Sequence, residues 1–377
     1  MADALAVDVA VIGGGIAGAT AAAHLSPTHS VVLLEQEGEL AYHSTSRSAA
    51  VYIENEGGPI FHRLSTASRP FFEAEHLELD APLLEPLPVL KVGDASQRQE
   101  FADDHAGAST ITPSVQLLEG DELAELCPVL RPNVTVGLLE PTAASIDVMG
   151  LHQLFVRRAR ANRADLRRNA RVTAIEHRKA GWTVTTANGT VHADVVVNAA
   201  GAWCDHVATL AGAQPVGLTP MRRTAFTTRI SVDPSDWPLI YSGIPGAECY
   251  FKPEAGNQLL CSLSDETPTE PCDARAEEID VARAIEHINT ISTLDIRSVG
   301  TTWAGLRTFA PDRNPVFGFD DVVDGFFWLA GQGGCGIVSS PAAGQIAAAL
   351  IAGDPLPASI TSLGLTVDQL APRRGGD

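Results

Sequence analysis

Several kinds of segment are missing from this sequence of 377 residues. No apolar run reaches the ~18 residues that a bilayer-spanning helix needs. No basic leader precedes the first apolar segment, so neither a transmembrane helix nor a secretory signal is expected. The six cysteines form no CxxC pair or regular framework, which favours a reducing, cytoplasmic setting. No cluster of His, Asp and Glu has metal-ligand spacing, so no metal is expected.

Positive charge is also scarce. Lys and Arg total 26 against 46 Asp and Glu, which gives a formal net charge of −20. Such a chain would be repelled by a nucleic acid backbone and by an anionic membrane surface. Its apolar content of 45% and charged content of 19% are those of an ordinary globular protein. Its length suits two packed domains rather than one core.

The N-terminal residues carry the pattern of a dinucleotide-binding unit. Residues 7–12 (VDVAVI) are typical of a strand that is buried on both faces, and GGGIAG follows at 13–18. Gly13 permits a tight turn, Gly15 lets the backbone approach a pyrophosphate, and Gly18 lets the next helix pack on the strand.

The continuation of the chain supports the same interpretation. An alanine-rich helix is expected from about residue 17 to 25, with its positive N-terminus facing the phosphates. A second strand at 30–34 ends in Glu35, which is placed to accept hydrogen bonds from a ribose diol. The alternative is a plain βαβ unit with a glycine turn.

Three further segments favour FAD over NAD. Residues 42–48 (YHSTSRS) offer hydroxyls and a cation for a pyrophosphate and the edge of a flavin. Residues 193–203 form another buried strand that ends in small residues. Residues 326–336 form a strand and glycine loop before a helix at 341–351, whose N-terminus could stabilise negative charge on a reduced flavin. Cofactor-like segments spread over the whole chain suit the long FAD molecule.

With these segments in view, the chain resembles the D-amino-acid oxidase/glycine oxidase (DAO) superfamily of flavoproteins. Within it, the chain is most similar to bacterial D-amino-acid dehydrogenases typified by D-arginine dehydrogenase. The resemblance runs from Val7 to the C-terminus. Its most specific parts are HST with RSAA at 43–50, residues 197–205, Arg222-Arg223, Tyr250 with Lys252-Pro253, and TWAGLRTFAPD at 302–312.

The resemblance implies an α/β fold with two domains. A Rossmann-like FAD-binding domain, with a parallel sheet and the GxGxxG loop, is expected to comprise residues 1–83, 143–215 and 301–377. A smaller α+β substrate domain with a mixed sheet is expected at 84–142 and 216–300.

The resemblance also implies a catalytic set. Oxidation of an amino acid requires a clamped carboxylate, a neutral amine and a Cα–H bond aimed at flavin N5. Arg307 is implied as the carboxylate anchor, since its planar fork can meet both oxygens. Arg223 is implied to face the active site, Tyr250 to close over the carboxylate, and the Gly334 carbonyl to accept a hydrogen bond from the amine. The alternatives are a surface arginine, a charge on the outer face of a strand and a core-edge tyrosine.

Noncovalent FAD is the expected cofactor. His43 and Ser44 are assigned to cofactor positioning rather than catalysis. Some relatives attach flavin through cysteine, but the matching place lies near Gly305, and Cys335 is expected to be a free thiol. The implied cofactor residues are Gly13, Gly15, Ile16, Ala17, Gly18, Glu35, Gln36, His43, Ser44, Thr45, Arg47, Ser48, Ala49, Val172, Ala200, Gly201, Trp203, Gly305, Arg307, Gly331, Gly333, Gly334, Gly336 and Ile337.

This chain differs from those relatives at positions that are expected to surround the substrate side chain. Arginine-preferring relatives carry an acid where this chain has Val89, a histidine at Val51 and a lid tyrosine at Glu56. Because Val89 cannot offset a buried cation, poor activity is expected with D-arginine and D-lysine. Glu56 could recruit a cation from a mobile lid, or it is a solvated loop acid.

The expected function is therefore oxidative deamination of a D-amino acid with a neutral or apolar side chain, through an imine to the 2-oxo acid. One alternative is a glycine/sarcosine-type secondary amine oxidase that produces hydrogen peroxide. Another is a flavin-binding protein without turnover. The electron acceptor (a quinone, an electron carrier or oxygen) and the oligomeric state stay open.

Overall fold

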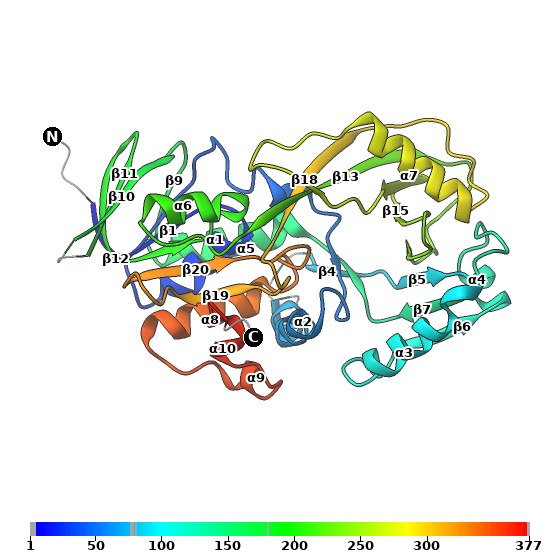
Figure 1. Cartoon of the computed structure of the whole chain (residues 1–377), viewed down its shortest axis with the longest axis horizontal. Coiled ribbons are helices and arrows are strands. Elements are labelled where there is room, and N and C mark those ends of the chain that lie inside the picture. Colours follow the sequence, from blue (N-terminus) through cyan, green and yellow to red (C-terminus); the bar gives the residue numbers. More distant parts are fainter. Residues whose placement is uncertain (1–4, 76–78, 80, 179–180, 375–377) are drawn as a thin grey trace.

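The computed structural model of the chain describes residues 5–75, 79, 81–178 and 181–374. Figure 1 shows two large sheets placed end to end, with the N-terminal βαβ unit at one end. Among the described residues, no helix is long and apolar enough to cross a membrane.

The sheet at the N-terminal end has the predicted Rossmann-like centre. Strands β2, β1, β12 and β20 are parallel neighbours, and β9 extends the parallel part beside β2. Antiparallel β10, β11 and β19 complete the sheet. Its described strands are β1 (Leu5–Ile12), β2 (Val31–Leu34), β9 (Asp165–Arg167), β10 (Val172–Arg178), β11 (Gly181–Thr186), β12 (Gly189–Asn198), β19 (Val316–Phe319) and β20 (Phe326–Ala330).

Both faces of this sheet are covered, which explains the continuous apolar run in β1. Val9 and Val11 pack on one face with α1 (Ile16–Leu25) and α8 (Ser340–Ala352). On the other face, Ala10 and Ile12 pack with α6 (Cys204–Leu210). Helices α1 and α8 pack closely, and the Thr20 hydroxyl donates to the Ser340 carbonyl at 2.9 Å.

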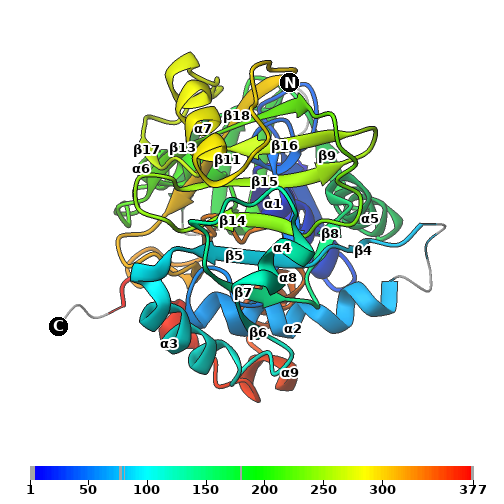
Figure 2. The ribbon, with the colours of Figure 1, turned by 90° about the vertical axis from the view of Figure 1, so that its right-hand side faces the viewer.

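The second large sheet is mixed, as expected. Its strands β14 and β5 are parallel, and the other pairs are antiparallel. Helices α4 (Asp121–Leu126) and α7 (Glu278–Ile291) pack on its outer face, and Figure 2 looks at the molecule from this end. Its described strands are β5 (Val89–Gly93), β6 (Gln116–Glu119), β7 (Val136–Glu140), β13 (Thr219–Arg229), β14 (Leu239–Ser242), β15 (Cys249–Glu254), β16 (Gln258–Ser262), β17 (Thr267–Pro268) and β18 (Thr302–Phe309).

A small third sheet and several helices join the two. The small sheet has the order β3 (Val51–Tyr52), β8 (Ala144–Ile146), β4 (Leu84–Pro86). The remaining described helices are α2 (Pro59–Glu75), α3 (Arg98–Ala108), α4 (Asp121–Leu126), α5 (Val148–Ala161), α7 (Glu278–Ile291), α9 (Ala358–Thr361) and α10 (Val367–Leu370), with 3-10 turns η1 (Ser44–Arg47), η2 (Ala95–Gln97) and η3 (Gly201–Trp203).

The long antiparallel pair β13 and β18 positions the site. It runs from the centre of the molecule into the second sheet (Figure 1), and its register pairs Arg223 with Gly305 and Arg307 with Met221. Strand β18 falls within the predicted FAD segment 301–377 but pairs with a strand of the predicted substrate segment 216–300. The two predicted domains are thus joined by a shared ladder, and their exact division stays a prediction. The predicted fold class is confirmed by the two sheets.

Candidate functional site

The glycine turn after β1 leaves no room for side chains. Gly13 has φ +108°, and a Cβ there would overlap with the Ala199 carbonyl group. A Cβ on Gly18 would overlap with the carbonyl oxygen of Gly13, so the helix packs against the turn as predicted. The turn therefore presents bare backbone and the N-terminus of α1 to the space above it, which suits a pyrophosphate.

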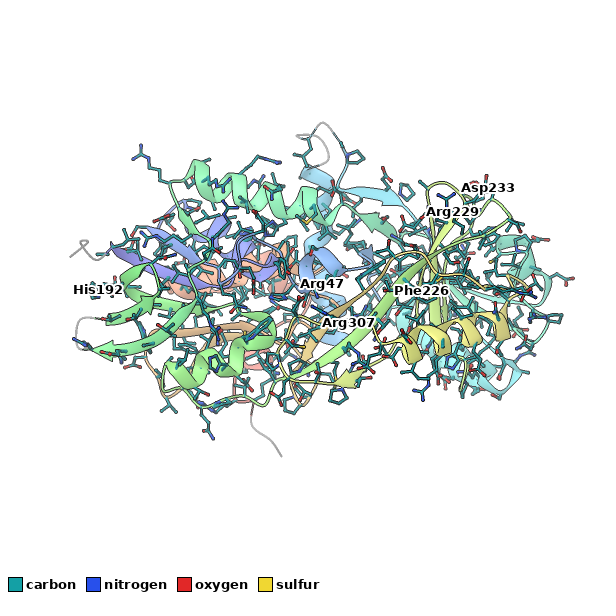
Figure 3. All side chains as sticks on the ribbon, turned by 90° about the horizontal axis from the view of Figure 1, so that it is seen from above. Arg47, His192, Phe226, Arg229, Asp233 and Arg307 are labelled. Carbon is teal, nitrogen blue, oxygen red and sulfur yellow. The ribbon has the colours of Figure 1, made fainter. Side chains whose placement is uncertain are left out.

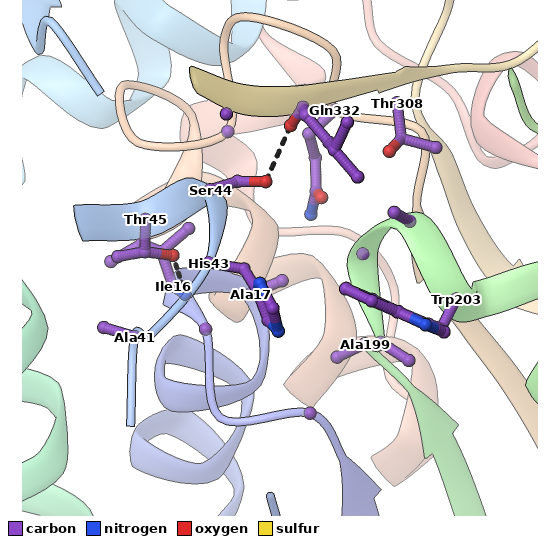
Figure 4. Close-up of a pocket in the computed structure, with 18 of the residues that line it drawn as sticks. Ile16, Ala17, Ala41, His43, Ser44, Thr45, Ala199, Trp203, Thr308 and Gln332 are labelled. Atoms are coloured by element: carbon purple, nitrogen blue, oxygen red, sulfur yellow. Dashed lines mark hydrogen bonds between the residues drawn. The ribbon is translucent and has the colours of Figure 1, made fainter. Parts of the chain in front are cut away.

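Hydrogen bonds from distant residues hold this turn in place. The Gly14 amide donates to Glu35 Oε2 at 2.6 Å, and the Gly14 carbonyl lies 3.0 Å from His152 Nε2. The Ile16 amide donates to the Thr45 hydroxyl at 3.0 Å (Figure 4). Glu35 Oε1 accepts from the Glu37 amide at 2.9 Å. Each carboxylate oxygen has a second lone pair, so the predicted ribose contact of Glu35 remains chemically available.

A cavity extends from this turn to the β13/β18 ladder. It is lined by every residue that was predicted to hold the cofactor except Gly18, which lies beneath the turn. The cavity also contains residues that the sequence did not single out, among them Thr308 and Gln332. Bare glycine backbone, hydroxyl donors and a helix N-terminus along one continuous cavity fit the phosphates and ring system of FAD.

The segment after β2 forms one wall of the cavity. Figure 4 shows Ser44 and Thr45 on one side and Ala199 and Trp203 on the other. The His43 ring lies 4.7 Å from the Trp203 ring, centroid to centroid, and His43 Nε2 lies 3.0 Å from Glu37 Oε1. These contacts are consistent with a positioning role, and the cofactor contacts themselves stay predictions.

A second cavity of about 750 Å³ opens beside the first. It is lined by Arg223, Tyr250, Arg307 and Gly334, which were predicted as catalytic, and by Val51, Glu56 and Val89, which were predicted to surround the substrate side chain. The four predicted catalytic residues line the first cavity as well. The fold therefore brings the four predicted catalytic residues to the junction of the two cavities and places the other three in the second cavity.

Arg307 is distinguished from the other described arginines because it is partly buried and yet has no partner; the other arginines without partners are exposed. Its guanidinium makes no hydrogen bond or ion pair within the described part of the chain, although the side chain is only partly exposed. It lies over Gly334, where a Cβ would come within 3.0 Å of Nη1. The hydroxyls of Tyr250 and Tyr241 likewise have no hydrogen-bond partner among these residues, and both tyrosines line the second cavity.

Arg223, in contrast, has hydrogen-bond and ion-pair partners within the protein. Its Nε donates to the Asp265 carbonyl at 2.7 Å, and its Nη2 lies 3.4 Å from Glu266 Oε1. Burial and the nearby charge of Arg307 lower the pKa of Arg223. Burial is also the main cause of the raised pKa of Tyr241, to which the Glu56 carboxylate adds. The carboxylates of Asp265 and Glu266 both act on Arg223, so the unpaired guanidinium of Arg307 is the group that can attract an anion.

One wall of the second cavity is apolar, and charged side chains, Glu140 among them, line other parts of it. The inner face of the mixed sheet contributes Val89 and Leu239, and Val51 of the small sheet packs with them. Val89 lies directly opposite Glu140 in the β5/β7 register. Glu140 is buried and accepts from the Glu54 amide at 2.7 Å and from Asn55 Nδ2 at 3.0 Å, so it holds the segment that carries Glu56.

Cys335 is a buried free thiol beside the junction. Its Sγ lies 3.7 Å from the Glu56 carbonyl oxygen, and burial raises its pKa. The thiol is therefore held in its neutral form, as expected for a packing residue. Within the described residues, no group of three or more His, Cys, Asp or Glu side chains is arranged to hold a metal ion.

Sequence reasoning missed three residues of the site. Tyr241 lies across from Tyr250 in the β14/β15 register, Glu266 pairs with Arg223, and His152 braces the glycine turn from α5. Only Tyr241 could have been found from the local sequence, because it lies two residues after Leu239 in a short apolar strand and so shares its face. The contacts of the other two join residues far apart in the sequence.

Comparison with known proteins supports this description. The family model described as "DAO: FAD dependent oxidoreductase" matches residues 8–350. A glycine oxidase of Bacillus licheniformis is 26% identical over 93% of this chain and 94% of its own length. The crystal structure of glycine oxidase from Geobacillus kaustophilus superimposes with a TM-score of 0.86 at 22% identity, covering 99% of this chain and 100% of that one. The L-proline dehydrogenase from P. horikoshii also gives a TM-score of 0.86, at 21% identity over 98% of each chain.

Proposed function

Because the chain belongs to the DAO family of FAD-dependent oxidoreductases, and so uses FAD to oxidise amines or amino acids, we propose that its substrate is an amino acid held by its carboxylate at Arg307. The observation that carries this proposal is the unpaired guanidinium of Arg307 at the junction of the two cavities. A partly buried cation without a protein partner is costly unless a ligand supplies the counter-charge.

Each residue at the junction has a role in this scheme. Arg307 binds both carboxylate oxygens through its fork, and the Tyr250 hydroxyl donates a further hydrogen bond. Arg223, fixed by the Asp265 carbonyl and Glu266, adds positive charge behind the carboxylate. The Gly334 carbonyl accepts a hydrogen bond from the substrate amine. These contacts fix the α-carbon against the cofactor cavity, and most of the catalytic effect is this positioning.

FAD, when bound, supplies the two-electron oxidant for the α-carbon–hydrogen bond. The amine must lose a proton before this step, and Val51 replaces the histidine that relatives carry nearby. We assign this proton to solvent, which reaches the amine through the open second cavity. The resulting imine takes up water and releases ammonia and a 2-oxo acid.

We further propose that the substrate is a D-amino acid with a neutral or apolar side chain. The D configuration rests on the resemblance to D-arginine dehydrogenase. The side-chain preference rests on Val89 and Leu239, which line a cavity of about 750 Å³. This volume lies within the range of sites that enclose whole drug-sized ligands. An apolar side chain would displace water from this wall, whereas the guanidinium of D-arginine would meet no acid at Val89.

A second candidate is the oxidation of glycine or an N-substituted glycine with release of hydrogen peroxide. It is favoured by the similarity to two glycine oxidases and to human dimethylglycine dehydrogenase, which is 24% identical over 90% of this chain and 42% of that protein. Glycine itself would leave most of the second cavity without van der Waals contacts. A flavin-binding protein without turnover is disfavoured because binding alone does not require an unpaired arginine. The electron acceptor and a cytoplasmic location stay predictions from the sequence.

An anaerobic screen tests the proposal. The purified flavoprotein is mixed with D- and L-amino acids, glycine and N-methylated amines, and bleaching of the flavin absorbance is timed. Air is then admitted to measure peroxide. D-leucine, D-methionine and D-phenylalanine are expected to reduce the flavin faster than D-arginine. Faster reduction by D-arginine would refute the side-chain preference, and reduction by glycine or N-methylated amines alone would favour the second candidate.

A further inference from the structure

The guanidinium of Arg47 binds protein groups, whereas its sequence context predicted a contact with the cofactor. Its position in a hydroxyl-rich loop predicted a phosphate contact. In the structure, Nη1 donates to the Ala274 carbonyl at 2.9 Å and to the Ala304 carbonyl at 3.0 Å. Nη2 pairs with Asp273 Oδ1 at 2.5 Å, and this hydrogen bond is the main cause of the lowered pKa of Asp273. The guanidinium therefore joins the glycine-turn side of the molecule to the mixed sheet.

The rest of the 44–47 turn makes the same connection. The Ser44 hydroxyl donates to the Leu306 carbonyl at 2.6 Å, and the Trp303 indole donates to the Arg47 carbonyl at 3.1 Å. The Arg47 side chain is also packed under β18, since a Cβ on Gly305 would come within 3.4 Å of its Cβ. Three hydrogen bonds thus join η1 to Trp303, Ala304 and Leu306 of β18, which immediately precede Arg307.

This placement matters because no described residue forms a hydrogen bond or ion pair with the Arg307 side chain. Its guanidinium has no partner in the described residues, so its position depends on the backbone of β18. Figure 3 shows Arg47 and Arg307 together at the centre of the molecule, whereas Arg229 lies toward the far end of β13. A shift of β18 relative to the cofactor cavity would displace the carboxylate clamp, and small displacements of this kind reduce catalysis strongly.

We propose that Arg47 is a positioning residue, which fixes β18 and thereby sets the carboxylate clamp of Arg307 over the cofactor. The inference rests on the proposed function, in which Arg307 receives the carboxylate. An arginine suits the task because its planar fork reaches two carbonyls and a carboxylate at once, whereas lysine presents a single ammonium.

The test compares Arg47→Met, Arg47→Lys and the matched control Arg229→Met, whose exposed arginine lies on β13 beyond the part that pairs with β18. FAD affinity is measured by fluorescence during titration of the FAD-free protein. Carboxylate affinity is measured on the FAD-loaded protein, from the change in flavin absorbance that benzoate causes. Amide hydrogen exchange is followed over β18.

For Arg47→Met we expect benzoate affinity to fall on the order of 10- to 100-fold, with FAD affinity within about threefold of the parent. The KM for the amino acid should rise more than kcat falls, and exchange over residues 302–309 should accelerate. Arg47→Lys should recover little of the loss, and Arg229→Met should change nothing. A loss of FAD affinity with normal benzoate binding would instead make Arg47 a phosphate ligand and overturn the proposal. Equal losses of both affinities, or no change in either, would also overturn it.

The proposed function can fail separately. If no amine bleaches the parent flavin and benzoate does not bind, the carboxylate clamp is wrong. The exchange measurement still decides the role of Arg47 in that case, because it reports on β18 without any substrate.

Discussion

Replacing Arg307 with methionine is the sharpest test of the site. Methionine has a similar length but no charge and no donor, so the variant loses the clamp and keeps most of the packing. No described residue bonds to the Arg307 guanidinium, so no internal hydrogen bond is lost. Burial and the charge of Arg307 lower the pKa of Arg223, so removing that charge relieves a repulsion. Thermal stability should therefore be unchanged or slightly higher.

The size of the catalytic loss follows from the two hydrogen bonds of the fork. Each hydrogen bond to a charged group contributes roughly 1.5–3 kcal/mol, so a bidentate pair contributes roughly 3–6 kcal/mol. At about 1.4 kcal/mol per factor of ten, this corresponds to a loss of about 10²- to 10⁴-fold. Arg307 is partly exposed and Arg223 can attract the carboxylate in its place, so we expect the lower half of that range.

The assay is anaerobic stopped-flow reduction of the bound flavin over a range of substrate concentrations. The flavin spectrum before mixing should match the parent, and reduction at ordinary substrate levels should be slower by about 10²- to 10³-fold. Arg307→Lys is the control, since it keeps the charge but not the fork, and it should recover part of the loss. Unchanged reduction kinetics in Arg307→Met would remove this residue from the mechanism and with it the observation that carries the proposed function.

Three further predictions concern the cofactor turn and the clamp. Gly18→Ala should lower the flavin-to-protein absorbance ratio because its methyl group would overlap with the turn, whereas Gly107→Ala on an open helix face should not. Burial lowers the pKa of His152 below 6.5, so the folded protein disfavours its protonated form. The stability that neutral His152 contributes should be complete above pH 6.5 and should decline as the pH falls through the lowered pKa. Melting temperatures of the parent and of His152→Gln, compared from pH 8 to 5, isolate this contribution. Tyr250→Phe should raise the KM for the substrate roughly tenfold with an intact flavin spectrum, and an unchanged KM would show that its hydroxyl does not contact the carboxylate.

The cofactor half of the molecule could be predicted from local pattern. The first strand, expected at 7–12, is β1 at Leu5–Ile12, and the helix expected from about 17 to 25 is α1 at Ile16–Leu25. The C-terminal helix expected at 341–351 is α8 at Ser340–Ala352. These elements are defined by residues close together in the chain, where apolar periodicity and glycine spacing carry the information.

Long-range register could not be predicted in the same way. The pairing of β18 with β13 joins residues about eighty positions apart, and it places a strand from the predicted FAD segment in the mixed sheet. The same kind of contact places His152 against Gly14 and turns Arg47 toward Asp273. Composition and spacing identify which residues are charged or small, but the partner of each is decided by packing across the whole chain.

The two ends of the proposed substrate cavity are built from different elements, and in the proposed scheme this separates two kinds of specificity. The anion-binding end rests on the β13/β18 ladder, which carries Arg223 and Arg307 and is fixed to the cofactor side through η1. The side-chain end is formed by β3, β5 and β14, which contribute Val51, Val89 and Leu239. A substitution on these strands changes the volume and polarity that a side chain meets, but it leaves the ladder and its unpaired guanidinium in place. The requirement for a carboxylate can therefore be retained while the preferred side chain changes, which is why similarity over the full chain length identifies the family more firmly than the substrate.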